Sequence, residues 1–88
     1  MPKKYNISYT KSVLKFLARH PDVAERLYEK LLIMTVDPFD PSLDIVPYRG
    51  HAGSYRMRIG KYRFLFAVID DDLVIYFYDA DSRGGIYN

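Results

Sequence analysis

The sequence predicts a small α+β domain in which one strand and two helices precede a set of antiparallel strands. Three observations predict it. The chain starts with an alternating segment, continues with two apolar stripes at helical spacing, and ends, after a proline-containing loop, with segments rich in Tyr, Phe, Val and Ile. With 88 residues, of which 49% are hydrophobic, the chain is expected to form one domain over residues 1–88.

Composition excludes several classes of protein. The chain has no cysteine and only two histidines, so a disulfide framework is excluded, a conventional zinc centre is not expected, and we expect no cofactor. No run of 18 apolar residues occurs, which excludes a membrane-spanning helix. The N-terminus lacks an apolar core of signal-peptide length, so we expect a cytoplasmic protein that does not contact a membrane.

The first part of the chain reads as a strand followed by two helices. Residues 4–10 alternate between apolar and polar side chains, the period of a half-buried strand. Apolar residues at helical spacing predict a short helix over about residues 11–19, which ends before a proline. The second helix is expected to begin at Asp22, because Asp22 and Glu25 have the spacing of a capping box. Two prolines then end it, and a loop runs to about residue 44.

The remainder reads as antiparallel strands joined by short turns. The expected strands are a weak one from Ile45, interrupted by Pro47, and three stronger ones over residues 54–59, 62–69 and 73–79. Gly60-Lys61 fits a two-residue hairpin loop of type II′, in which Gly60 has a positive φ.

This turn fixes which residues of the hairpin share a face. Counting outward from it, Arg58 lies opposite Arg63, and Arg56 lies opposite Leu65. The apolar face, expected to pack against the helices, is formed by Tyr55, Met57, Ile59, Tyr62, Phe64, Phe66 and Val68. Two arginines directly across from each other cost about 0.2–1 kcal/mol, and we infer that something anionic offsets this cost.

The order of the charges supports the same inference. Residues 45–69 contain five basic and no acidic residues, whereas residues 70–81 contain five acidic and no basic ones. The planar fork of arginine binds phosphate through paired hydrogen bonds, so the basic segment favours a phosphate-bearing partner such as a nucleic acid. The alternative is that these arginines are the ordinary polar side chains of a solvated sheet face.

The last predicted strand leaves two possibilities open. Asp70, Asp71 and Asp72 form a two- or three-residue loop. With two residues in the loop, Tyr76 and Tyr78 join the arginines, where they are placed to stack on bases. The alternative is that both are ordinary, half-buried strand tyrosines.

Two further residues at the C-terminus are candidates for the site. Arg83 is the only basic residue after the aspartate-rich segment, and the two glycines that follow let the chain turn closely over the sheet. This arrangement would bring Tyr87 towards the arginines.

The order of elements, together with the hairpin sequence from Tyr55 to Arg63 and the terminal Arg83 and Tyr87, resembles the RelE/ParE superfamily of bacterial and archaeal toxins. The resemblance covers nearly the whole chain and implies a RelE-like fold. It also implies a toxin of a type II toxin–antitoxin system that enters the ribosomal A site and cuts mRNA without a metal. The implied partners are the ribosome with its mRNA and a cognate antitoxin, with which the toxin can form a hetero-oligomer.

The resemblance also implies roles for individual residues. The catalytic positions of the family fall on Arg56, Arg58, Arg63, Arg83 and Tyr87. We expect further contacts to RNA from Arg49, Lys61 and Tyr78.

The sequence departs from its relatives at the general base. Arginine stays protonated at accessible pH, and relatives can offer lysine at the positions of Arg56 and Arg58. Many relatives also carry histidine where this chain has Ser82. We interpret His51, alone in a loop, as a bystander, so the general base is unassigned.

Two alternatives therefore remain besides a ribosome-dependent nuclease. The first alternative is a ParE-like inhibitor of DNA gyrase, and the second is a decayed toxin that only binds its antitoxin.

Overall fold

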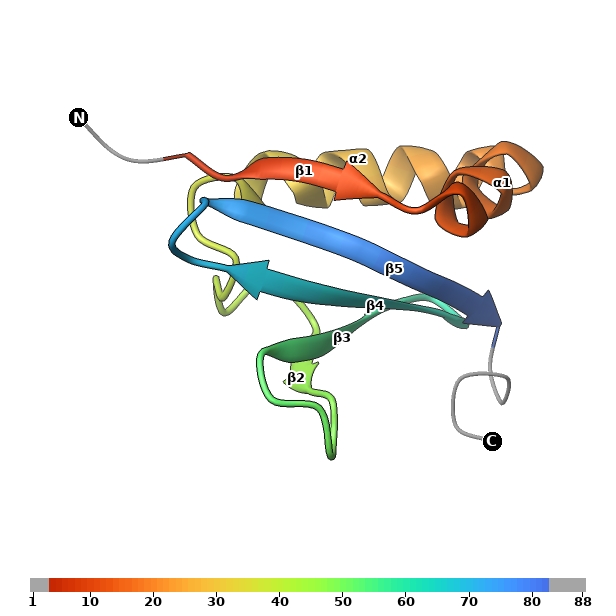
Figure 1. Ribbon diagram of the computed structural model, residues 1–88. Helices are drawn as coiled ribbons and strands as arrows, with labels where there is room; N and C mark the ends of the chain where they lie inside the picture. Colours follow the sequence, from red (N-terminus) through yellow and green to blue (C-terminus); the bar gives the residue numbers. More distant parts are fainter. Residues whose placement is uncertain (1–3, 83–88) are drawn as a thin grey trace.

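The computed structural model of the protein describes residues 4–82. Its elements follow the predicted order of one strand, two helices and further strands (Figure 1). They are β1 (Asn6–Tyr9), α1 (Lys11–Arg19), α2 (Pro21–Met34), β2 (Ile45–Pro47), β3 (Ser54–Ile59), β4 (Tyr62–Ile69) and β5 (Val74–Ser82).

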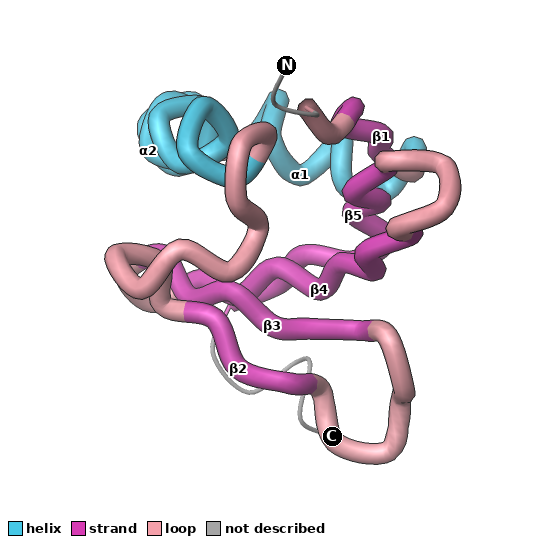
Figure 2. Tube along the Cα trace, turned by 90° about the vertical axis from the view of Figure 1, so that its left-hand side faces the viewer, coloured by secondary structure: helices cyan, strands magenta, loops and turns pink. Residues whose placement is uncertain are grey.

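The strands form one twisted sheet in the order β1-β5-β4-β3-β2. β1 runs parallel to β5, and every other neighbouring pair is antiparallel. Both helices lie on the same side of this sheet (Figures 1 and 2), so within residues 4–82 no helix covers its other face. The predicted α+β fold class is confirmed.

The two helices begin in different ways. Thr10 caps α1, because its Oγ1 accepts a hydrogen bond from the backbone N–H of Val13 at 3.2 Å. The capping box predicted at Asp22 is wrong. α2 begins one residue earlier, at Pro21, and its cap residue His20 makes no side-chain capping bond. The fixed φ of proline suits the first helical position, where no N–H is needed, so Pro21 starts the helix instead of only ending the one before it.

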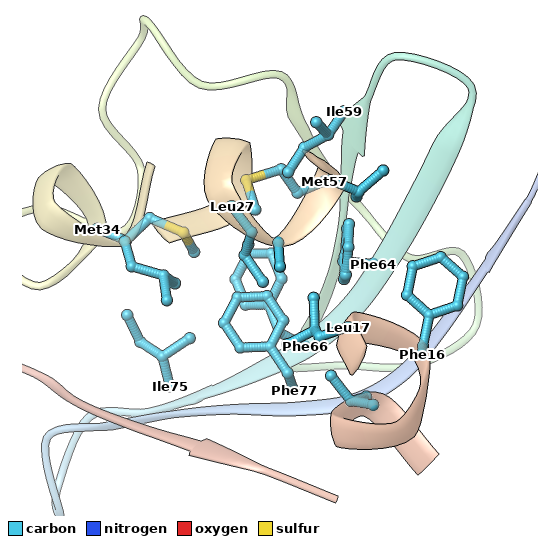
Figure 3. Packing of buried hydrophobic residues seen from close by; sticks show 14 of the residues in the cluster. Phe16, Leu17, Leu27, Met34, Met57, Ile59, Phe64, Phe66, Ile75 and Phe77 are labelled. Carbon is cyan, nitrogen blue, oxygen red and sulfur yellow. The ribbon is translucent and has the colours of Figure 1, made fainter. Parts of the chain in front are cut away.

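The hydrophobic core lies between the helices and the inner face of the sheet (Figure 3). Phe64, Phe66 and Phe77 are fully buried at its centre, and the Phe77 ring packs against those of Phe66 and Phe64, with centroids 5.2 and 6.3 Å apart. The apolar face predicted for the hairpin is confirmed. All seven of its residues belong to this core or pack against it: Tyr55, Met57, Ile59, Tyr62, Phe64, Phe66 and Val68.

The turn between β4 and β5 differs from its prediction. Ile69 pairs with Val74, so the loop contains four residues rather than two or three. Leu73, with a φ of +53°, closes it, and its N–H donates to the carbonyl of Asp70 at 3.2 Å. The three aspartates alone did not indicate that Leu73, in a left-handed backbone conformation, belongs to the loop.

Candidate functional site

Three arginines occupy the outer surface of the β3–β4 hairpin, which we call the arginine face and define by Arg56, Arg58 and Arg63. The register is as predicted, with Arg58 opposite Arg63 and Arg56 opposite Leu65. Since side chains alternate along a strand, these three point away from the helices. The hairpin therefore places three guanidinium groups on the side of the sheet that no helix covers.

The turn that sets this register also has the predicted geometry. Gly60 has a φ of +60°, and Lys61 keeps a negative φ, which is the combination that a type II′ turn requires. Lys61 is exposed at the tip of the hairpin, and its Nζ lies 5.5 Å from the centre of the Tyr62 ring. This contact places its ammonium group beside Tyr62, a residue of the apolar face, at the end of the sheet.

Arg58 is held by a carboxylate that the sequence analysis did not assign. Its Nε donates to Oδ2 of Asp44 at 2.9 Å, and its backbone N–H donates to the carbonyl of the same residue at 3.0 Å. Both side chains are more than half exposed, at 58% and 52%, so this ion pair contributes at most about 1 kcal/mol to stability. Its main consequence is orientation, because a guanidinium held at Nε keeps its two terminal nitrogens available.

The loop before Asp44 is organised by its own polar side chains. Oδ1 of Asp40 accepts hydrogen bonds from the backbone N–H and the hydroxyl of Ser42, at 2.9 and 2.7 Å. These bonds lower the pKa of Asp40, since they stabilise its charged form. The buried side chain of Leu43 then anchors the loop next to Asp44.

The acidic segment of the chain lies beside the basic one. Arg63 pairs across β4 and β5 with Asp81, and both residues are half-buried. The fold thus places two carboxylates, those of Asp81 and Asp44, near the arginines of this face. Carboxylates of the protein itself therefore offset part of the Arg58–Arg63 repulsion, which the inference of an anionic partner did not include.

Two tyrosines share the arginine face, as one of the two sequence interpretations proposed. Tyr76 pairs with Ala67, which lies on the same side of the sheet as Arg63, and its ring stacks on that of Tyr78 with centroids 6.4 Å apart. A β-bulge between Leu65 and Phe66 leaves Tyr78 without a direct partner in β4. Both tyrosine rings lie on one face because side chains alternate along β5, and the bulge then places Asp79 and Asp81 opposite Leu65 and Arg63.

The remaining predicted residues fall at the edges of the site or beyond the described chain. Arg49 is exposed in the loop between β2 and β3, where it lines a groove together with Arg56. His51 lies in the same loop, stacked on Tyr48. Arg83 and Tyr87 lie outside the described residues.

Residues 4–82 contain neither a membrane-spanning helix nor a metal-binding cluster. No helix in this part of the chain has the length and apolar character needed to cross a bilayer. Over the same residues, no three side chains of His, Cys, Asp or Glu come together in a way that could hold a metal ion.

Comparison with known proteins places this arrangement in a family. No family model matches the chain. It is 31% identical over 86 residues to "Putative toxin RelE1" of Methanocaldococcus jannaschii, and the match covers 96% of each chain.

Solved structures agree with this relative. The archaeal RelE–RelB complex from Pyrococcus horikoshii OT3 contains a chain with a TM-score of 0.80 and 28% identity, covering 93% of this chain and 98% of that one. The antitoxin–toxin complex RelB–RelE from Methanococcus jannaschii gives a TM-score of 0.74 at 26% identity, with 92% and 95% covered.

The fold and the comparisons together define the protein. Two helices packed on one face of a five-stranded sheet, with a β3–β4 hairpin that carries arginines on the other face, form the RelE-like fold. The chain belongs to the RelE family of toxins of type II toxin–antitoxin systems.

Proposed function

We propose that this protein is a ribosome-dependent endoribonuclease that cleaves mRNA in the A site. The observation that carries the proposal is the arginine face, where the hairpin register gathers Arg56, Arg58 and Arg63 on the helix-free side of the sheet. Guanidinium groups bind phosphate oxygens through paired, charge-assisted hydrogen bonds, so this surface suits an RNA backbone.

The proposed reaction is attack of a ribose 2′-hydroxyl on the adjacent phosphate. A bond forms between the 2′-oxygen and phosphorus, and the bond from phosphorus to the 5′-oxygen breaks, which leaves a 2′,3′-cyclic phosphate and a 5′-hydroxyl. The 2′-hydroxyl loses a proton and the leaving 5′-oxygen gains one. Between these events the phosphorane carries extra negative charge, and fixed positive groups that meet this charge lower the barrier.

The arginines suit the stabilisation of that charge and not the proton transfers. Arginine remains protonated, so Arg58 and Arg63 act as electrostatic groups, and the ion pair with Asp44 orients Arg58 for this role. We assign charge stabilisation at the leaving group to Arg83, and base stacking or proton transfer to Tyr87. The general base stays unassigned.

We also propose that a cognate antitoxin holds the protein inactive. The similar chains from Pyrococcus horikoshii and Methanococcus jannaschii were solved as complexes of RelE with RelB. A basic surface attracts an acidic partner, so an acidic, partly helical antitoxin segment that covers the arginine face would block RNA from it. Co-purification with the product of the neighbouring gene tests this, and Arg58→Glu is expected to weaken the complex.

Primer-extension mapping of mRNA in a purified translation reaction tests the nuclease proposal. The reaction is run with wild type, Arg63→Ala, Arg83→Ala and the control Arg19→Ala, which removes an exposed arginine on the helical side. We expect cuts within A-site codons that require ribosomes, that persist with the control and that are lost with the other two variants.

Intact mRNA in the presence of folded wild-type protein would refute the proposal. A DNA supercoiling assay then separates the alternatives, because a gyrase inhibitor alters supercoiling, whereas a decayed toxin changes neither readout. A variant at position 63 or 83 that remains fully active would refute the role assigned to that residue.

A further inference from the structure

The loop between β2 and β3 borders a groove that contains Arg49 and Arg56, and its aromatic residue, Tyr48, has no role so far. The groove has a volume of about 460 Å³ and is lined by Val46, Pro47, Tyr48, Arg49 and Arg56. This volume lies within the range of small-ligand sites, about 300–1,000 Å³. Because Val46 pairs with Arg56 across β2 and β3, both point to the same side of the sheet. β2 is the edge strand that lies away from the helices (Figure 2), so the groove extends the arginine face toward this edge of the sheet.

Two consecutive turns give this loop a defined shape. The N–H of His51 donates to the carbonyl of Tyr48 at 3.1 Å, and the N–H of Ser54 donates to the carbonyl of His51 at 3.0 Å. The third residues of these turns are Gly50 and Gly53, with φ values of +82° and +80°, as type II turns require. A loop closed in this way has little ordering entropy left to lose when a ligand binds.

The turns place an aromatic ring against the groove. The rings of Tyr48 and His51 stack with centroids 4.7 Å apart and an angle of 17° between their planes. Tyr48 lines the groove and His51 does not, so the imidazole supports the tyrosine ring from outside the groove. Arg49 and Arg56 supply positive charge beside the ring.

We propose that this groove is a subsite for one nucleotide of single-stranded RNA, next to the phosphate that is cleaved. The base stacks on Tyr48, and Arg49 and Arg56 bind the flanking phosphates. An aromatic platform next to cationic side chains is the usual chemistry of single-strand recognition. The identity of the ligand rests on the proposed nuclease function.

Binding of a short oligonucleotide tests the subsite without ribosomes or cleavage. The probe is a fluorescein-labelled hexamer of 2′-O-methyl adenosine, which lacks the attacking hydroxyl, and its affinity is measured by anisotropy over a range of salt concentrations. The variants are Tyr48→Leu, which keeps apolar bulk without the ring, Tyr48→Phe, which keeps the ring, and Arg56→Gln. Tyr28→Leu, at an exposed tyrosine of α2, is the matched control.

Stacking and phosphate binding leave different signatures in this assay. Tyr48→Leu is expected to lower the affinity about tenfold without changing its salt dependence, since stacking releases no counterions. Arg56→Gln is expected to reduce the slope of log K against log salt by about 0.7, the value for one phosphate contact on a single strand. Tyr48→Phe and the control are expected to stay within about twofold of the wild type.

The outcomes separate this inference from the proposed function. Equal affinity of wild type and Tyr48→Leu, or no binding of the hexamer by the wild type, would overturn the subsite even if the protein cuts mRNA on ribosomes. Hexamer binding that depends on the Tyr48 ring, in a protein that cuts no mRNA, would support the subsite and refute the nuclease. Thermal unfolding of each variant checks that the half-buried ring is not needed for folding.

Discussion

Removing the carboxylate of Asp44 separates the orientation of Arg58 from its charge. In Asp44→Ala the guanidinium of Arg58 loses the carboxylate that its Nε contacts at 2.9 Å, while the backbone hydrogen bond between the two residues remains. Because both side chains are more than half exposed, we expect a stability loss of about 0.5 kcal/mol. For a domain of this size that lowers Tm by about 2–4 °C.

The effect on cleavage is expected to be larger than the effect on stability. A released arginine must be immobilised again in the transition state, at a cost of about 0.5–1.5 kcal/mol. This corresponds to a cleavage rate about two- to twelvefold lower, since 1.4 kcal/mol is a factor of ten. Affinity for RNA is not expected to fall, because the surface has lost a negative charge.

Single-turnover cleavage of ribosome-bound mRNA, with hexamer binding measured in parallel, checks this prediction. Asp72→Ala is the matched control, because it removes the same charge from the exposed β4–β5 loop. Cleavage by Asp44→Ala at the wild-type rate, or an equal loss in the control, would show that the ion pair does not orient Arg58 for the reaction.

Three further predictions concern the scaffold. Gly60→Ala is expected to lower the free energy of unfolding by about 1–2 kcal/mol in urea titrations, because alanine is strained at a φ of +60°. Phe77→Ala removes a fully buried ring and is expected to cost about 3–5 kcal/mol, whereas Leu32→Ala, at a side chain that is 75% exposed, is expected to cost far less. Hydrogen bonds from Ser42 lower the pKa of Asp40 below its ordinary value of 3.8. Their contribution to the stability of the folded state is therefore present above pH 3.8 and is lost as the pH falls through the lower pKa of the folded state. Asp40→Asn is therefore expected to unfold with a weaker pH dependence below pH 4, measured by circular dichroism.

Local patterns predicted the hairpin well because its geometry is set by neighbouring residues. A glycine at the first turn position and a period of two along both strands are enough to place Arg58 opposite Arg63. The starts of elements were harder to predict. Asp22 has the spacing of a capping box, yet the neighbouring proline fits the first helical turn and begins α2 one residue earlier.

The length of the loop before β5 was also hard to predict from neighbouring residues. Three consecutive aspartates mark a turn, but its length depends on Leu73 adopting a positive φ, which is uncommon for a leucine. The register between β4 and β5 therefore depends on how the two strands pack, and the sequence of the loop does not determine it. Ile75 and Phe77 are nevertheless both fully buried, which agrees with the alternative in which Tyr76 and Tyr78 join the arginines on the other face.

The sequence by itself determined the order of the elements, the apolar face of the hairpin and the alignment of the three arginines, because each depends on residues close together in the chain. Only the tertiary structure decided which carboxylates approach those arginines. Asp44 is 14 residues from Arg58, and Asp81 reaches the opposite side of Arg63 only because β5 lies between β1 and β4 in the sheet. Contacts of this kind depend on sheet order and on the β-bulge in β5, which the packing of the core sets and no local pattern encodes.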